Sequence, residues 1–276
     1  MMSADSLSGW LALREPADIA ARSAAMTQAI AEVLPPDRPL RILDLGSGTG
    51  SNVRYLSSRL PAPQQWLVVD RDPDLLAEMS GAAASSHVET LCRNLGVLDD
   101  PALFTGRHLV TASALLDLVS EEWLRTLSER CRSSGSAALF CLNYNGHSRC
   151  TPAEAEDEAI RDLMNRHQRS SDKGFGRAAG PDAVRSAERC FAAAGYQVRR
   201  AASDWLLAPD QGELQRQLIE GWAQAAEEIA PGHRAMIHDW LARRLGHVDA
   251  GRSRVVVGHE DLAAWLPQIT WAAVAP

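Results

Sequence analysis

Three glycines on alternate positions constrain this chain more than any other feature: residues 46–50 read GSGTG. The mostly apolar residues 40–45 precede them and predict a buried strand. Residues 51–60 follow with the apolar spacing of a helix. Glycine tolerates a positive φ and lets a ligand approach the backbone with no Cβ in the way. The first N–H groups of a helix are unpaired and carry partial positive charge. The pattern therefore predicts a ligand-binding loop at the carboxyl end of a strand.

An acid at the end of the next apolar run completes this signal. Asp70 follows Trp66–Val69, and an acid at this place in doubly wound folds accepts hydrogen bonds from ribose hydroxyls. The glycine spacing is GxGxG instead of the GxGxxG of dinucleotide sites, and Asp44 stands two residues before Gly46. A carboxylate there disfavours a pyrophosphate but suits an ammonium group. No Gly-Lys-Ser/Thr follows, so a P-loop is excluded. A cationic, phosphate-free nucleoside is the predicted ligand.

Strand-like and helix-like segments alternate with short connections, which predicts an α/β fold with a doubly wound, mostly parallel sheet. In the first half, strands are expected over residues 40–45, 66–69, 88–92, 108–112 and 137–142, and helices over 10–34, 51–60, 73–84 and 121–131. In the second half, we expect helices over 181–194 and twice within 210–246, and strands over 196–201 and 254–258, then a short helix and a possible strand over 269–274.

These segments predict four parts of the chain. Residues 1–39 form an N-terminal helical cap, residues 40–146 a cofactor-binding Rossmann-like core, and residues 181–276 the remainder of the α/β domain with a helical insertion. Residues 147–180 are polar and rich in charge and glycine, so they are expected to form an inserted lid over the substrate.

Composition narrows the class of partner. The formal net charge is −7, with 28 Lys+Arg against 35 Asp+Glu, which disfavours nucleic acid as a partner. The five cysteines show no CxxC spacing, so neither a disulfide framework nor a metal site is expected. No signal peptide or membrane-length apolar run is seen, and the expected compartment is the cytoplasm. The oligomeric state stays open.

Residues 42–50, ILDLGSGTG, resemble the first motif of the class I S-adenosylmethionine-dependent methyltransferases, and residues 68–72, VVDRD, resemble their second. Residues 93–95 and 111–117 are similar to the family's segments after the third and fourth strands. The resemblance covers about residues 40–145, and weakly as far as residue 200. It implies S-adenosylmethionine as cofactor and a seven-stranded sheet of order 3-2-1-4-5-7-6 whose seventh strand is antiparallel. Residues 255–257 or 269–274 would supply an edge strand.

The resemblance also implies a set of cofactor-binding residues at the strand ends and on the N-terminal helix. The set is Arg22, Asp44, Gly46, Ser47, Gly48, Gly50, Asn52, Asp70, Arg71, Asn94, Leu95 and Ser113. Asp44 and the glycine loop would hold the methionine portion, Asp70 the ribose, and Arg71 would flank the adenine. Arg22 would pair with the methionine carboxylate, or it is an ordinary surface arginine. Asn94 departs from the family's commoner acid, but its side-chain oxygen could still accept from the adenine amino group.

Methyl transfer from a sulfonium is an in-line displacement, so the enzyme aligns the acceptor and excludes water. A hydroxyl acceptor usually needs a general base as well. Asp117, Tyr144 and His147 are the candidates because they follow the fourth and fifth strands. Alternatively, Tyr144 is a pocket wall and His147 a lid-surface histidine. Residues 113–116 read SALL where nucleic-acid amino methylases carry an Asn/Asp-Pro-Pro-aromatic tetrad, which disfavours base methylation.

The predicted function is therefore methyl transfer from S-adenosylmethionine to the oxygen or nitrogen of a small molecule. Two alternatives stay open. The first is a non-catalytic, methyltransferase-like protein that binds S-adenosylmethionine or regulates a partner. The second is a nicotinamide-dependent oxidoreductase, which the glycine spacing disfavours.

Overall fold

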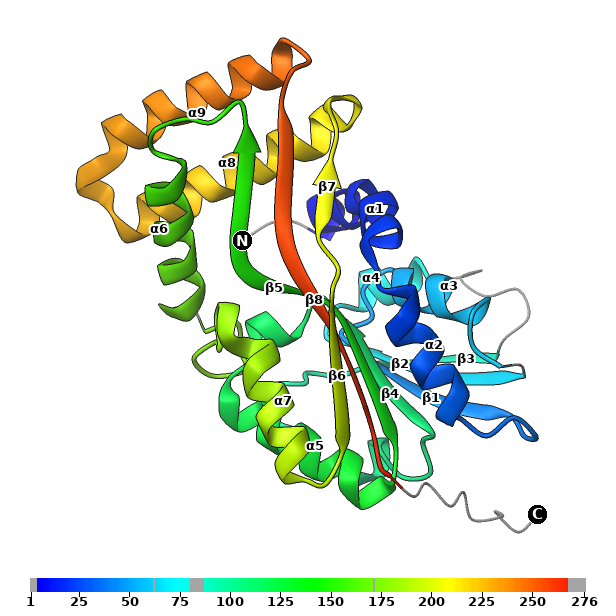
Figure 1. The fold of residues 1–276 in the computed structure, drawn as a ribbon. Helices are drawn as coiled ribbons and strands as arrows, with labels where there is room; N and C mark the ends of the chain where they lie inside the picture. The colour runs from blue at the N-terminus through cyan, green and yellow to red at the C-terminus, as the bar shows by residue number, and fades with distance from the viewer. Residues whose placement is uncertain (1–3, 62, 80–86, 171, 268–276) are drawn as a thin grey trace.

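A computed structural model describes residues 4–61, 63–79, 87–170 and 172–267, and its centre is an eight-stranded sheet covered by helices (Figure 1). The strand order is β3-β2-β1-β4-β5-β8-β6, and β7 pairs with β8 as well. The strands are β1 Leu40–Leu45, β2 Gln64–Asp70, β3 His87–Cys92, β4 Leu109–Ser113, β5 Ala137–Thr151, β6 Gln197–Ala202, β7 Trp205–Leu207 and β8 Arg254–Trp265. Strands β1 to β5 pair in parallel, and β8 is antiparallel to β5, β6 and β7.

The predicted doubly wound sheet is confirmed, including the antiparallel strand that enters between the fifth and sixth strands. The described part of the chain has eight strands, one more than expected, because β7 pairs with residues 255–257 beyond the part of β8 that β6 covers. The short helix predicted after Gly258 is wrong, since residues 259–265 continue β8. Residues 269–274, the other candidate for an edge strand, lie outside the described residues.

Two apolar cores lie on the two faces of the sheet. Helices α2, α3 and α4 contribute to one core, and α5 and α7 to the other. The helices are α1 Ala4–Ala21, α2 Ala24–Val33, α3 Ser51–Ser57, α4 Pro73–Ala77, α5 Glu121–Ser134, α6 Asp157–Ser170, α7 Ala183–Ala193, α8 Gly212–Ile229 and α9 Arg234–Asp249. Among the described residues, no helix has both the length and the apolar content needed to cross a bilayer.

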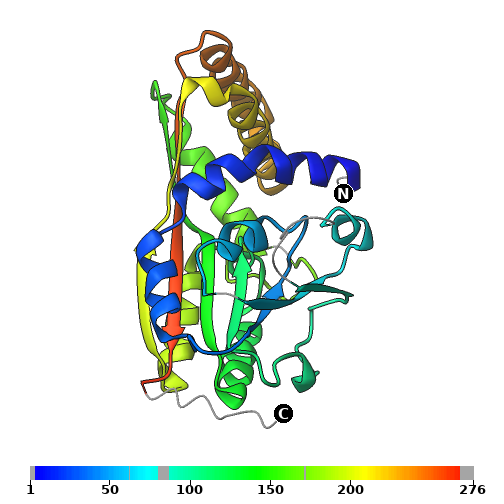
Figure 2. The ribbon, with the colours of Figure 1, turned by 90° about the vertical axis from the view of Figure 1, so that its right-hand side faces the viewer.

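The N-terminal helix expected over residues 10–34 is divided into α1 and α2 at Arg22 and Ser23. Ser23 is the N-cap of α2, and its hydroxyl accepts from the Met26 N–H at 3.3 Å. The Ser23 N–H donates to the Asp261 carboxylate on β8 at 2.8 Å. The break redirects the chain: α1 crosses between the carboxyl ends of the parallel strands and the helices α8 and α9 (Figure 2).

Strands β5 and β8 continue past the parallel sheet, and helices α6, α8 and α9 pack beside this extension (Figure 1). We call residues 144–170 and 205–257 the upper lobe. Its core is apolar and includes Tyr144, Trp205, Trp222 and Trp240. In the segment predicted as a lid, residues 147–151 belong to β5, and α6 packs against α8.

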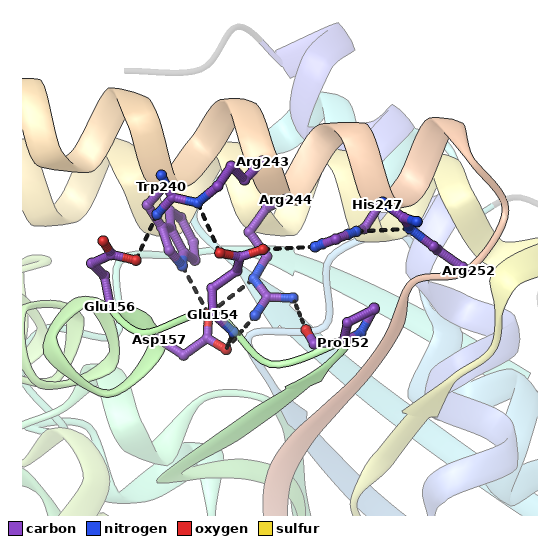
Figure 3. Close-up of polar contacts among 9 residues, drawn as sticks. All are labelled: Pro152, Glu154, Glu156, Asp157, Trp240, Arg243, Arg244, His247 and Arg252. Atoms are coloured by element: carbon purple, nitrogen blue, oxygen red, sulfur yellow. Dashed lines mark hydrogen bonds and ion pairs between the residues drawn. The ribbon is translucent and has the colours of Figure 1, made fainter.

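An ion pair between a buried arginine and a partly buried aspartate joins α9 to the start of α6 in this lobe (Figure 3). Arg244 is fully buried, and its guanidinium donates to both carboxylate oxygens of Asp157 and to the Pro152 carbonyl. The Trp240 indole N–H donates to the same carboxylate at 2.8 Å. The neighbouring Arg243 makes more exposed ion pairs with acids of the same segment. Arg244 therefore satisfies buried polar groups that α9 and α6 would otherwise leave unpaired.

Candidate cofactor and acceptor site

The glycine loop adopts the conformation for which glycine was expected. Gly46, Gly48 and Gly50 all have positive φ, at 66°, 52° and 84°. A Cβ on Gly48 would lie 3.1 Å from the Leu11 side chain, so α1 passes directly over the loop. The N–H groups of Gly46 and Ser47 donate to the Val69 carbonyl, which turns the loop over the end of β2. The Leu11 side chain of α1 therefore lies against the loop that follows β1 and turns over the end of β2.

Asp70 ends β2 and is held in place by two backbone donors. Its carboxylate accepts from the Gly48 N–H at 2.8 Å and from the Asp72 N–H at 3.0 Å. An ionised carboxylate offers about four acceptor sites. Asp70 is thus oriented by the glycine loop and keeps the capacity to accept two hydroxyl groups.

Asp44 lies beneath the loop in a buried polar chain. The Asn52 amide donates to Asp44 Oδ1 at 2.6 Å and to the Thr111 hydroxyl at 3.1 Å, and Arg22 donates to Asn52 Oδ1 at 2.6 Å. The other carboxylate oxygen, Asp44 Oδ2, is buried and has no hydrogen-bond partner among the described residues. Burial raises the pKa of Asp44 to about 6. An ammonium donor at Oδ2 would satisfy this oxygen and favour the charged carboxylate.

We expect the pH dependence of unfolding to reveal this buried acid. The pKa of Asp44 is about 6 in the folded protein and lies above the ordinary value of 3.8. The free energy of unfolding therefore falls as the pH rises from about 4 to above 6, because ionisation of the buried carboxyl is less favourable in the folded state. Asp44→Asn lacks this cost and should match the wild type near pH 4. Near pH 7.5 it should exceed the wild type by up to about 3 kcal/mol. Urea denaturation of the ligand-free proteins at both pH values measures the difference, and a pH-independent difference would contradict the assignment.

Arg22 is buried, so the interpretation as an ordinary surface arginine is wrong. Its guanidinium stacks on the Tyr55 ring at 4.0 Å and donates to the Cys141 sulfur at 3.2 Å. Its Nε is buried without a partner among the described residues. Arg22 thus places a positive charge close to Asp44 and Asn52, on the methionine side of the predicted site.

The segment expected near the adenine lies against a loop formed by residues 172–176. Arg71 donates to the Lys173 carbonyl at 3.2 Å, and a Cβ on Gly96 would lie 2.3 Å from the Gly174 carbonyl oxygen. The Asn94 side-chain oxygen accepts from the Gly96 N–H. The Leu95 side chain is buried in the sheet core, and the Leu95 carbonyl accepts from the Trp123 indole N–H at 2.7 Å. Part of the predicted lid therefore contacts the expected adenine end.

Ser113 ends β4 opposite Cys141 of β5 and is half-buried. The Leu115 side chain that follows lies in contact distance of the place a Gly46 Cβ would occupy. Asp117 comes two residues later and is buried; burial raises the pKa of its carboxyl to about 6. The end of β4 thus carries a buried acid to the neighbourhood of the glycine loop.

The other two catalytic candidates, Tyr144 and His147, lie on β5, whereas Asp117 follows β4. Tyr144 is buried, its hydroxyl donates to the Asn165 side chain at 2.9 Å, and burial raises the pKa of its phenol. His147 is exposed in the irregular part of β5, and its backbone N–H donates to Asn145. The contacts of the described residues join Tyr144 to the upper-lobe core, and they do not bring the His147 side chain to Asp117. The catalytic roles of both residues stay predictions.

No protein-family model matches this sequence, and no curated protein matches it. Solved structures do match this chain, at low sequence identity. The strand order of the sheet, with its antiparallel strand between the fifth and sixth strands, is the one that the resemblance to class I methyltransferases implies. Phosphoethanolamine N-methyltransferase 2 of Haemonchus contortus, solved with S-adenosylhomocysteine, is 15% identical over 97% of this chain and 59% of that chain, with a TM-score of 0.48.

Two further structures show the same kind of likeness. The cyclopropane synthase MmaA2 of Mycobacterium tuberculosis is 12% identical over 87% of this chain and 83% of that chain, with a TM-score of 0.45. YcgJ of Bacillus subtilis is 12% identical over 89% of this chain and 100% of that chain, with a TM-score of 0.48.

The fold places further polar residues beside two of the catalytic candidates, Asp117 and Tyr144. We call Arg14, Asp18, Asp117, Tyr144, Trp205 and His259 the Arg14 cluster. Arg14 and Asp18 lie one turn apart on α1, whereas Trp205 and His259 come from β7 and β8. The spacing of Arg14 and Asp18 is the only local signal, because an i,i+4 ion pair can be predicted from a helix. The other contacts depend on the tertiary fold.

Proposed function

We propose that this protein transfers the methyl group of S-adenosylmethionine to a small-molecule acceptor. One observation carries the proposal: a buried carboxylate with an unpartnered oxygen, Asp44, lies under a glycine loop whose neighbour Asp70 is oriented with free acceptor capacity. The first fits an ammonium group and the second fits a pair of ribose hydroxyls. A diphosphate would bring negative charge beside Asp44, which argues against a nicotinamide dinucleotide.

The chain's own residues would divide the work as follows. Asp44 binds the ammonium of the methionine portion, and Arg22 supplies the positive charge on that side. Asp70 holds the ribose, while Arg71 and Asn94 border the adenine. Leu11 on α1 covers the loop and keeps water from it. The bound cofactor supplies an electrophilic methyl group on a sulfonium. Asp117, near the tip of β4, is the candidate to take a proton from the acceptor.

Calorimetric titration with S-adenosylmethionine, S-adenosylhomocysteine and oxidised nicotinamide dinucleotide tests the cofactor. We expect the first two to bind and the third to give no heat. The second step is a mass-spectrometric assay for S-adenosylhomocysteine formed in the presence of a panel of small acceptors. Binding of the dinucleotide alone would refute the proposal. Cofactor binding with no turnover on any acceptor would favour the non-catalytic alternative.

A further inference from the structure

The Arg14 cluster is built around one guanidinium. Arg14 donates to both oxygens of Asp18, at 2.9 Å and 3.1 Å, and lies 5.0 Å from the centre of the Trp205 ring. The Trp205 indole N–H donates to the same Asp18 carboxylate at 3.0 Å. The positive charge of Arg14 is therefore matched by Asp18 within its own helix.

His259 on β8 faces Tyr144 on β5, and their ring centres lie 6.3 Å apart. The Trp205 ring lies on the other side at 5.1 Å. Only 6% of His259 is exposed, and its Nδ1 is buried with no partner among the described residues. Burial, with a smaller contribution from Arg14, lowers the pKa of His259 to about 3, so the ring is neutral. The neutral imidazole therefore keeps a buried nitrogen without a hydrogen-bond partner among the described residues, between the rings of Tyr144 and Trp205.

Asp117 is the second group that lacks a partner, here a charged one, because no cationic side chain in the described part of the chain neutralises its carboxylate. Arg14 influences it electrostatically, and backbone N–H groups of Asp117 and Tyr144 interact with its carboxyl. Among the described residues, no arginine, lysine or histidine forms an ion pair with it. Since Asp18 already balances Arg14, the Arg14 cluster holds one carboxylate more than it holds cations. What is missing is a hydrogen-bond donor that carries positive charge.

This place adjoins the proposed cofactor site. Leu11 and Arg14 lie on successive turns of α1, and Leu11 contacts the glycine loop. Leu115 contacts the loop from the other side, two residues before Asp117. A ligand at Asp117 would therefore lie next to the tips of β1 and β4, where the methyl group of the cofactor is expected.

We propose that the acceptor is a primary or secondary amine, bound as its ammonium ion between Asp117 and His259, and that this protein is an N-methyltransferase. The inference rests on the proposed function. The Asp117 carboxylate takes one proton from the ammonium ion, and the freed lone pair attacks the methyl carbon. The new C–N bond forms as the C–S bond breaks, and the bonding pair stays on sulfur. The products are an N-methylammonium ion and S-adenosylhomocysteine, and Asp117 returns its proton to water.

The test compares matched acceptors and binding on the wild-type protein. Pairs such as phenethylamine and phenethyl alcohol, and cyclohexylamine and cyclohexanol, differ only in the acceptor atom. We expect methylation of at least one amine, with its matched alcohol at least about tenfold slower because the alcohol leaves the Asp117 charge unpaired. In the S-adenosylhomocysteine complex, calorimetry should detect the same amine and not its alcohol. Methylation of alcohols in preference to amines would overturn the inference while leaving the proposed function intact.

Variants then test whether Asp117 causes the preference for amines over alcohols. Asp117→Asn should lower kcat/KM for the amine by roughly 100-fold or more, the scale of a lost general base, and His259→Gln should raise KM more than it lowers kcat. Both should bind S-adenosylhomocysteine within about twofold of the wild type, the check that each is folded and its cofactor site is intact. His233→Gln, an exposed histidine before α9, is the control and should change neither value. Full amine activity in Asp117→Asn overturns the inference. Failure of the wild type to bind either cofactor form would instead refute the proposed function.

Discussion

Arg244→Met should lower the free energy of unfolding by about 3–5 kcal/mol, the usual cost of removing one partner of a buried ion pair. The methionine would fill much of the volume, but it would leave the Asp157 carboxylate and the Pro152 carbonyl without their donor. Urea denaturation followed by circular dichroism measures the loss. Hydrogen exchange should locate it, with amides of α6 and α9 losing protection before those of the parallel sheet.

The adjacent residue provides a matched control. Arg243 contacts Glu154 and Glu156 from a side chain that is 40% exposed, so Arg243→Met should cost no more than about 1 kcal/mol. Replacing both partners of the buried pair, as in Arg244→Met with Asp157→Leu, should recover much of the lost stability because no charge is left unpaired. Equal losses in Arg243→Met and Arg244→Met would show that burial of the pair is not what matters.

The conformation of the glycine loop and the place of Asp70 at the end of β2 could be predicted because their signals are local. The spacing of Gly46, Gly48 and Gly50 dictates a bend with positive φ, and Asp70 ends the next strand along the sheet. Each feature depends on residues that are neighbours in the chain or at the ends of adjacent parallel strands. At such places the sequence pattern predicts the local conformation correctly, because the conformation does not depend on distant residues.

The partners of Asp117 in the Arg14 cluster and the second half of β8 could not be predicted, because buried polar residues interrupt the apolar pattern there. His259, Glu260 and Asp261 interrupt the apolar run of β8 and suggest a chain that leaves the sheet. Asp261 is nevertheless fully buried, since the backbone N–H groups of Ser23 and Leu142 donate to its carboxylate. Those partners come from α2 and β5, far away in the sequence. An acid satisfied in this way has no signature in a hydropathy pattern.

The upper lobe follows the same principle. Residues 147–180 are rich in charge and were expected to form an inserted lid; the structure shows that this segment holds the extension of β5 and the partly buried carboxylate of Asp157. The partner of that acid, Arg244, is distant in the chain. The charge pattern alone therefore could not distinguish a lid from a packed lobe.

Asp70→Ala should weaken binding of S-adenosylhomocysteine by roughly 3 kcal/mol, about 100-fold. Each of the two ribose hydroxyls would lose its hydrogen bond to the carboxylate, and a hydrogen bond to a charged group contributes about 1.5–3 kcal/mol. The substitution also removes the acceptor for the Gly48 N–H and so frees the glycine loop. Asp70→Asn keeps one acceptor oxygen and should fall between the alanine variant and the wild type. Calorimetric titration gives all three dissociation constants.

Asp72→Ala is the control for this series, since Asp72 lies on the same turn and caps α4 through the N–H groups of Asp74 and Leu75. Its loss should cost about 1 kcal/mol of stability without changing cofactor affinity. Should Asp70→Ala bind S-adenosylhomocysteine as tightly as Asp72→Ala does, the ribose does not contact the end of β2. The assignment of Asp44 to the ammonium group would then be in doubt as well, because one ligand that spans the glycine loop must contact Asp44 with its ammonium group and Asp70 with its ribose.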